Sequence, residues 1–275
     1  MSKRIFIFLG CFVLILGIAV YAEKNGMLGG PDSQTSVPEN DGNSGKYDND
    51  RAGAKFEETF RNRTAEGVDL AGEIFRPILD TSPFNEELQQ YRTEQVSLQN
   101  NSIIMTADKK PEGYVSGKVE SKIGFRYGKF SFRVRTTNGT GLFPAIWMLS
   151  VDGYGYPEID IYEMIGSDPD RIYGVMHYME AGNKKRNYFE HQFPEENVPE
   201  TYVISYEWTP DKMDWYVNDE MVHSIQKKIP DVPMFMIMNL AVGGKWPGNP
   251  AEDTQFPTDF EVEILQFEPE EIYIR

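Results

Sequence analysis

The chain has 275 residues, with 43 acidic against 27 basic side chains and a formal net charge of −16. A charge this negative opposes contact with phosphate groups, so nucleic acid is excluded as a predicted partner. Cys11 is the single cysteine of the sequence, which excludes an intramolecular disulfide framework and a cysteine-based metal site. The length is that of one large β-sandwich domain.

The N-terminus has the pattern of an export signal. Lys3 and Arg4 precede an uncharged apolar run over residues 5–22, and Val20-Tyr21-Ala22 places small residues before a candidate cleavage point. The same run reaches the short end of the length that a membrane helix needs. Residues 1–22 are therefore predicted to be a signal peptide or an N-terminal anchor. Either role places the remainder outside the cytoplasm, secreted or tethered to the outer face of the cell membrane.

A change of composition divides the rest of the chain. Residues 23–55 are rich in Gly, Asp, Asn, Ser and Pro, and they contain too few apolar side chains to offset the entropy of ordering. We interpret them as a disordered linker. Phe56 and Phe60 have the i, i+4 spacing of a short helix that leads into a domain over 56–275.

From about residue 76 the hydrophobic pattern has a period of two. Polar and apolar residues alternate over 129–135, and 214–222 reads as a strand, a tight turn and a returning strand. Further strands are predicted over 115–122, 202–208, 234–241 and 261–267. No helical period persists, so the sequence predicts an all-β fold, a sandwich of two sheets.

The segment from Pro157 to Met164 contains three carboxylates in alternation with apolar residues. Glu158 and Asp160 share one face of a regular strand, but Glu163 is an odd number of residues away and would point to the other face. A one-residue bulge near Ile161 or Tyr162 would return Glu163 to the first face. Their side chains would then approach to roughly 5 Å, as expected for a retaining glycosidase.

The pattern alone leaves other interpretations open. Alternating acidic and apolar residues also suit a half-exposed strand of an acidic protein, and three carboxylates could bind calcium. In a catalytic site, the third carboxylate would help to keep one Glu protonated as the acid while the other is ionised.

The residues EIDIYE at 158–163 resemble the signature of glycoside hydrolase family 16 in its bulged form. The similarity continues in the order of the family, and its laminarinase branch is the nearest. It is carried by 85–91 (NEELQQY), 116–117 with 127–130, 141–149 (GLFPAIWML), 206–218 and 238–250 (MNLAVGGKWPGNP).

The resemblance implies a jelly-roll sandwich and a role for each matching residue. Glu158 would be the nucleophile, Glu163 the general acid/base, and Asp160 the residue that tunes them. Residues expected to bind substrate are Trp147 and Trp246 as stacking platforms, with His177, Asn85, Asn239 and Tyr156 as further contacts. Tyr156 stands near the position where laminarinases usually have Trp. No metal and no cofactor are predicted, because Glu263 lies where the family commonly has an Asp that ligates structural calcium.

The leading hypothesis is an exported, endo-acting hydrolase that cleaves β-1,3-glucan or mixed β-1,3/1,4-glucan with retention of configuration. We expect it to act as a monomer on a polysaccharide. Alternatives within the family are an enzyme for agar or carrageenan and a transglycosylase that remodels a cell wall. A non-catalytic carbohydrate-binding jelly roll is the alternative of another class, and the paired Glu158 and Glu163 argue against it.

Overall fold

The computed structural model describes residues 69–82, 85–135, 137–153 and 155–275. The predicted signal or anchor, the linker and the short helix near Phe56 and Phe60 all lie outside these residues. Within the described part of the chain, no helix combines the length and the apolar character needed to cross a membrane.

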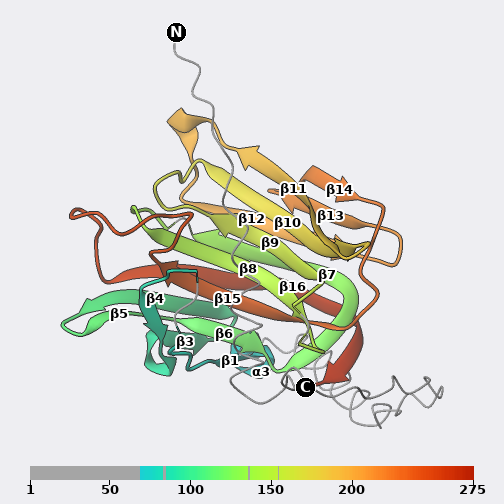
Figure 1. Ribbon diagram of the computed structural model, residues 1–275, viewed down its shortest axis with the longest axis horizontal. Helices are drawn as coiled ribbons and strands as arrows, with labels where there is room; N and C mark the ends of the chain where they lie inside the picture. The colour runs from blue at the N-terminus through green and yellow to red at the C-terminus, as the bar shows by residue number, and fades with distance from the viewer. Residues whose placement is uncertain (1–68, 83–84, 136, 154) are drawn as a thin grey trace, which may run out of the picture.

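The described chain forms strands with only short helical segments, and its strands lie in two layers (Figure 1). The first sheet contains, in order of pairing, β11 (Asn183–Gln192), β10 (Arg171–Glu180), β9 (Glu158–Met164), β8 (Leu142–Ser150), β15 (Met234–Val242), β6 (Lys118–Ser121) and β1 (Phe75–Pro77). The second contains β14 (Glu220–Ile225), β13 (Met213–Val217), β12 (Thr201–Trp208), β7 (Ile123–Arg135), β16 (Thr258–Ile274), β4 (Ser102–Lys110) and β3 (Val96–Gln99). The sheets are joined where Met234 of β15 pairs with Phe125 of β7.

Smaller elements complete the fold. They are the helix α3 (Leu70–Ile74), the 3-10 helices η1 (Thr93–Gln95) and η2 (Glu195–Asn197), and the strands β2 (Gln89–Tyr91) and β5 (Gly113–Ser116). β2 and β5 are parallel, whereas the other described strand pairs are antiparallel. The side chain of Asp69 caps α3 by accepting a hydrogen bond from the backbone of Gly72 at 2.9 Å.

The core lies between the two sheets and is rich in aromatic side chains. Tyr162 of β9 packs on Tyr202 of β12 and Phe260 of β16, with ring centroids 6.2 and 5.8 Å apart. These strands are not hydrogen-bonded neighbours, so the contacts join the two layers face to face. The predicted all-β sandwich is confirmed, and Trp208 and Trp215 are buried in its core.

The period-two pattern correctly predicted which side chains are buried. On β7, Phe130, Phe132 and Val134 are buried, while Arg133 and Arg135 are exposed. The predicted hairpin is present as β13 and β14, and its turn residues Asn218 and Asp219 have φ angles of 48° and 66°. Positive φ at both turn positions matches the right-handed twist of the paired strands.

Three predicted strands differ from the structure in their extent, and one of them, the run 129–135, is the second half of the longer strand β7. The run 115–122 is divided between β5 and β6 at Gly117, where a Cβ atom would lie only 2.6 Å from the carbonyl oxygen of Gln95. The close approach of another backbone therefore interrupts the strand. The last strand, β16, is longer than the predicted run 261–267 because it pairs with β7 along most of that strand's length.

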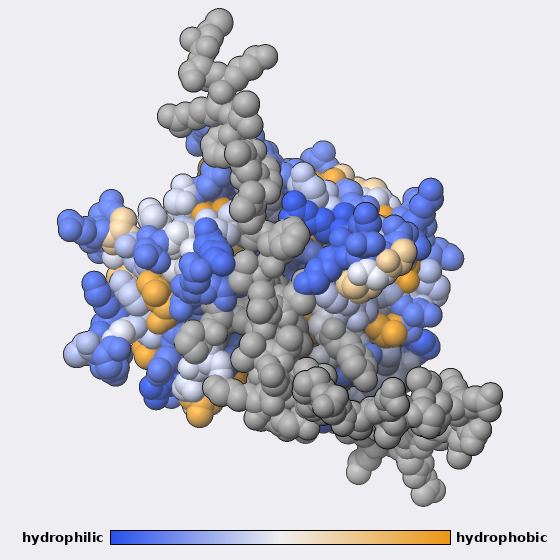
Figure 2. Space-filling model, viewed as in Figure 1, coloured by the Kyte–Doolittle hydropathy of each residue, from blue (hydrophilic) through white to orange (hydrophobic). Residues whose placement is uncertain are grey.

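Figure 2 shows that hydrophilic side chains predominate on the described surface of the face in view. Large apolar side chains that are exposed anywhere in the described chain are Leu79, Leu88, Val151, Met179, Tyr188, Met221 and Leu265.

Candidate active site

A bulge in β9 brings the three carboxylates onto one face of the first sheet. On β8, Leu149, Trp147 and Ala145 pair with Glu158, Asp160 and Glu163, and the register shifts between Ile146 and Trp147. Ile161 is the additional residue. Because directly paired residues share a face, Glu158, Asp160 and Glu163 lie in one row. The predicted bulge is confirmed, and we call this side of β8–β11 the carboxylate face.

The other side of β9 explains why the bulge is stable. Ile159, Ile161, Tyr162 and Met164 are buried in the core between the sheets. Two consecutive apolar residues, Ile161 and Tyr162, can both be buried only if the strand departs from strict alternation. The buried side chains therefore hold the strand in the conformation that places Glu163 beside Asp160.

Two of the three carboxylates are almost fully removed from solvent, and Glu163 is half-buried. Glu158 is 3% exposed and Asp160 is 4% exposed. Burial raises the pKa of Glu158 well above its usual range, and the charges of Asp160 and Glu163 raise it further. Burial also raises the pKa of Glu163, with a further contribution from Asp160, while the positive charge of Arg186 acts in the opposite direction. Glu158 and Glu163 therefore retain protons at a pH where exposed carboxyl groups have lost theirs.

Glu163 has an oxygen available for an external group. Its Oε2 atom is buried and has no hydrogen-bond partner among the described residues. Buried polar oxygens are normally hydrogen-bonded, so an unpaired oxygen in a polar site is suited to a bound molecule. With a raised pKa, this carboxyl group can deliver a proton to that molecule.

His177 lies against the other end of the row. It pairs with Glu158 between β10 and β9, and its Nε2 atom is 3.3 Å from Oδ2 of Asp160 and 3.9 Å from Oε1 of Glu158. An N–H at this position can donate a hydrogen bond to Asp160. Ligand atoms of Glu158, Asp160 and His177 lie within 4.8 Å of one another, a spacing that could also accept a cation.

Tyr156 immediately precedes the catalytic strand and is close to Glu158. Burial and the charge of Glu158 raise the pKa of Tyr156 to about 12. The phenol therefore remains a hydrogen-bond donor at any ordinary pH. The amine of Lys184, on β11, lies 5.9 Å from the centre of the Tyr156 ring.

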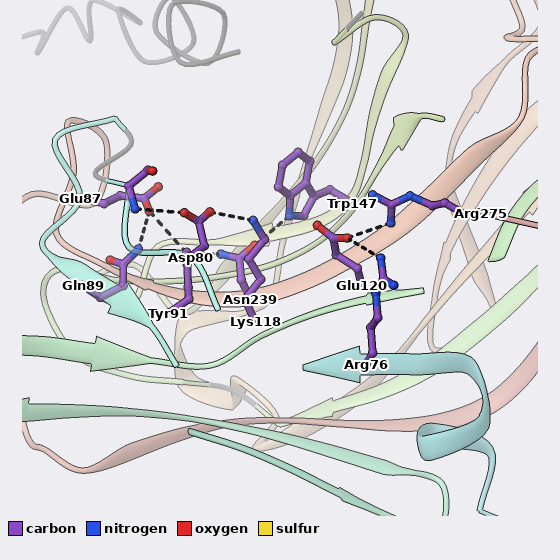
Figure 3. Close-up of polar contacts among 11 residues, drawn as sticks. Arg76, Asp80, Glu87, Gln89, Tyr91, Lys118, Glu120, Trp147, Asn239 and Arg275 are labelled. Carbon is purple, nitrogen blue, oxygen red and sulfur yellow. Dashed lines mark hydrogen bonds and ion pairs between the residues drawn. The ribbon is translucent and has the colours of Figure 1, made fainter. Parts of the chain in front are cut away.

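Trp147 lies on the carboxylate face, and its indole nitrogen is held by Asn239 of β15. The Nε1 atom of Trp147 donates to Oδ1 of Asn239 at 2.8 Å, and Nδ2 of Asn239 donates to the hydroxyl of Tyr91 at 3.1 Å (Figure 3). Trp147 remains half-exposed, as a stacking platform requires. Both ends of the Asn239 amide contact protein groups, so this geometry positions Trp147. Direct contact of Asn239 with substrate stays a prediction.

Trp246 contacts two aromatic residues of the same face. Its ring lies 5.4 Å from that of Phe143 on β8 and 5.0 Å from that of Tyr173 on β10, both with edge-to-face geometry. Tyr173 pairs with Glu163, so this aromatic group lies beside the general acid/base candidate. Trp246 is half-buried and still presents part of its ring to solvent.

Asn85 lies at the start of the segment that leads into β2. Its backbone has a φ angle of 50°, and its Oδ1 atom is buried without a hydrogen-bond partner among the described residues. Its carbonyl oxygen accepts a hydrogen bond from the backbone of Lys245, next to Trp246. The free amide oxygen is consistent with a hydroxyl partner, and that role stays a prediction.

Tyr91, Tyr173 and Arg186 were not among the residues predicted from the sequence. Tyr173 could have been found, because it is four residues from His177 on one strand and must share its face. Arg186 pairs with His177 across the β10–β11 hairpin, and Tyr91 reaches Asn239 from a distant segment. The contact of Tyr91 with Asn239 depends on tertiary packing that no local pattern specifies, whereas the turn at Ala181 and Gly182 sets the pairing of Arg186 with His177.

The arrangement can support a double displacement on one molecule. One carboxylate can attack a carbon centre while the other carboxyl group protonates the leaving oxygen. Half-exposed indole rings beside such a row suit the apolar faces of sugar rings.

Comparison with known proteins agrees with this geometry. The sequence profile for "Glycosyl hydrolases family 16" matches residues 84–263. A beta-glucanase from Rhodothermus marinus is 32% identical over 216 residues, which cover 66% of this chain and 74% of that protein. A glucan endo-1,3-beta-glucosidase from Cryptopygus antarcticus is 32% identical over 178 residues, covering 56% of this chain and 66% of that protein.

The fold is also that of a solved enzyme. The laminarinase catalytic domain from Thermotoga maritima superposes with a TM-score of 0.60 at 29% identity, covering 70% of this chain and 90% of that domain.

Proposed function

Because the chain belongs to glycosyl hydrolase family 16, and is therefore a glycosidase, we propose that it is an endo-acting enzyme that cleaves β-1,3-glucan or mixed β-1,3/1,4-glucan with retention of configuration. The observation that carries the proposal is the bulge at Ile161, which puts Glu158, Asp160 and Glu163 on one face of β9. Relatives named as glucanases support the substrate class.

In the first step, a carboxylate oxygen of Glu158 attacks the anomeric carbon of the sugar. The bond between that carbon and the glycosidic oxygen breaks, and Glu163 gives its proton to the departing oxygen. The products are a shortened glucan and a glycosyl ester on Glu158. The raised pKa of Glu163 and its unpaired oxygen suit it to this transfer.

In the second step, Glu163 is ionised and accepts a proton from a water molecule that attacks the same carbon. The ester bond breaks, and Glu158 is released as a carboxylate. Because each step inverts the anomeric carbon, the product retains the original configuration. Asp160 lies between the two groups, and its charge raises the pKa of both, while His177 lies 3.3 Å from Asp160.

Two tryptophan rings on the carboxylate face support binding of the glucan at internal positions of its chain. Trp147 lies opposite Asp160, and Trp246 lies against Tyr173 beside Glu163. Two apolar rings along one row can stack on successive sugars of a chain, which suits cleavage within the polymer.

We also propose that the enzyme acts outside the cytoplasm, either secreted or tethered by residues 5–22, and as a monomer. The support is the pattern of Lys3 and Arg4 followed by an uncharged apolar run. Fractionation of producing cells, with the N-terminal sequence of the exported form, tests this part. Retention of the whole chain in the cytoplasm would contradict it.

The enzymatic proposal is tested by release of reducing ends from a panel of β-1,3-glucan, mixed-linkage β-glucan, agarose and carrageenan. We expect internal cleavage of the two glucans, and a retained anomeric configuration in the first product by NMR. Cleavage confined to agarose or carrageenan would contradict the substrate class. An inverted first product would contradict the mechanism.

A further inference from the structure

A chain of hydrogen bonds runs from Trp147 away from the carboxylate face. It passes through Asn239 on β15 and Tyr91 on β2 to Glu87 (Figure 3). The hydroxyl of Tyr91 lies 3.4 Å from Oε2 of Glu87, and Nε2 of Gln89 donates to the same oxygen at 2.5 Å. Tyr91 and Asn239 are each only 7% exposed, so water does not readily replace these bonds.

The direction of every bond in this chain follows from the indole ring. The Nε1 atom of Trp147 can only donate, so Oδ1 of Asn239 must accept from it. The other end of the amide, Nδ2, then donates to the oxygen of Tyr91. The Tyr91 proton is left to bond with Glu87, which is therefore the terminal acceptor.

Glu87 is also held by the loop that carries Trp246. Glu87 pairs with Gly243, and Leu88 donates its backbone N–H to the carbonyl of Val242 at 2.8 Å. The backbone N–H of Val242 donates to Oε1 of Gln89 at 2.7 Å. The carboxylate thus has a fixed place between β2 and this loop, and the hydrogen-bond chain ends on a rigid support.

We propose that Glu87 is a positioning residue that sets the orientation of Trp147 on the carboxylate face through Tyr91 and Asn239. The indole that it orients lies opposite Asp160. The kinetic consequence rests on the proposed glucanase function, whereas the hydrogen-bond chain itself is made only of protein groups.

The hydrogen-bond chain from Trp147 to Glu87 responds to pH at Glu87. Burial raises the pKa of Glu87 to about 7, Gln89, Lys118 and Tyr91 lower it, and Asp80 raises it. Lys118 is paired with Asp80 at 3.3 Å, and its amine lies 5.5 Å from the centre of the Tyr91 ring. An ionised carboxylate accepts hydrogen bonds more strongly than a protonated one, so the chain tightens as pH rises through about 7.

The first test is NMR of the indole N–H groups in the full-length, ¹⁵N-labelled protein between about pH 5.5 and 8.5, a range that brackets the titration of Glu87. Trp147→Phe identifies the resonance of Trp147. We expect a titration step near pH 7. The step should be absent in Glu87→Gln and present in Glu86→Gln, a matched control whose carboxylate is paired with Lys245 instead. A step that survives in Glu87→Gln, or that is absent from the native protein, would overturn the proposal.

The second test is a double-mutant cycle on a β-1,3-glucan. Glu87→Leu removes the acceptor and should raise KM about 3- to 10-fold, with kcat changed less than about twofold, while Glu87→Gln restores most of the affinity. In Trp147→Phe, which has no N–H, Glu87→Leu should raise KM by less than about 1.5-fold.

If Glu87→Leu raises KM by the same factor in the native protein and in Trp147→Phe, Glu87 acts independently of Trp147, and the proposal is overturned. If Glu87→Leu does not fold, Tyr91→Phe breaks the same chain and takes its place in the cycle. If the native enzyme cleaves no glucan, the proposed function fails, and the indole titration still decides the role of Glu87.

Discussion

Trp147 and Asp160 are directly paired across β8 and β9, at the position where the bulge begins. The indole ring and the central carboxylate therefore share one face and one row. A sugar stacked on Trp147 lies next to the carboxylate row, so binding and chemistry depend on the same strand register.

Glu158→Gln should abolish nearly all glucan hydrolysis, with a loss of roughly 10⁴-fold or more in kcat, because the amide keeps the shape but cannot form the glycosyl ester. Reducing-end release measures the loss, and circular dichroism verifies the fold. Activity near the native rate would remove Glu158 from its role as nucleophile.

Glu163→Ala should lower kcat by about 10² to 10⁴-fold on glucan, because no proton reaches the departing oxygen. Aryl glycosides with good leaving groups need less protonation of the departing oxygen. The rate at which they form the glycosyl ester should therefore fall much less. Added azide should partly restore turnover and yield a glycosyl azide. An equal loss on good and poor leaving groups would contradict the acid/base role.

Stability should decrease as the pH rises from 5 to 8.5. Glu87, Glu158 and Glu163 all have a pKa above their ordinary value of 4.5 because of burial. The folded protein therefore favours their protonated forms, and this stabilisation is complete below about 4.5 and is lost as pH rises through the raised values. Urea denaturation at several pH values measures the slope. Glu158→Gln should reduce it, and an unchanged slope in that variant would contradict the burial effect at Glu158.

Trp246→Ala should mainly raise KM, whereas Trp147→Ala should raise KM and also lower kcat. Trp147 pairs directly with Asp160, whereas Tyr173 lies between Trp246 and Glu163. Stacking farther from the cleaved bond stabilises the bound substrate and the transition state equally. Loss of Trp147 also leaves Oδ1 of Asn239 without its donor beside the carboxylate row. Steady-state kinetics on a β-1,3-glucan separates the two effects, and kcat losses of equal size would contradict the distinction.

Treatment with EDTA should leave activity unchanged. Although Glu158, Asp160 and His177 could jointly bind a cation, the proposed mechanism needs the Glu158 carboxylate free to attack. Dialysis against EDTA, followed by assay with and without added calcium, checks this. Activity that is lost and then restored by calcium would contradict the prediction that no metal is needed.

The sequence by itself determined the all-β fold, the burial along β7 and the need for a bulge in β9. These features are local, because alternation of polar and apolar residues decides which side of a strand is buried. The odd spacing between Glu158 and Glu163 required the bulge if both were to share a face. The bulge keeps the three carboxylates on one face of β9, and it also allows the consecutive residues Ile161 and Tyr162 to be buried together.

Only the tertiary structure decided which distant residues meet that row. Tyr91 and Asn239 are separated by 148 residues, and their contact depends on how β2 and β15 are arranged in space. Strand spacing alone puts Tyr173 on the face of His177, but its pairing with Glu163 depends on the register between β9 and β10. Strand register is set by the packing of whole sheets and not by any one strand, so no local pattern of residues could have specified these neighbours.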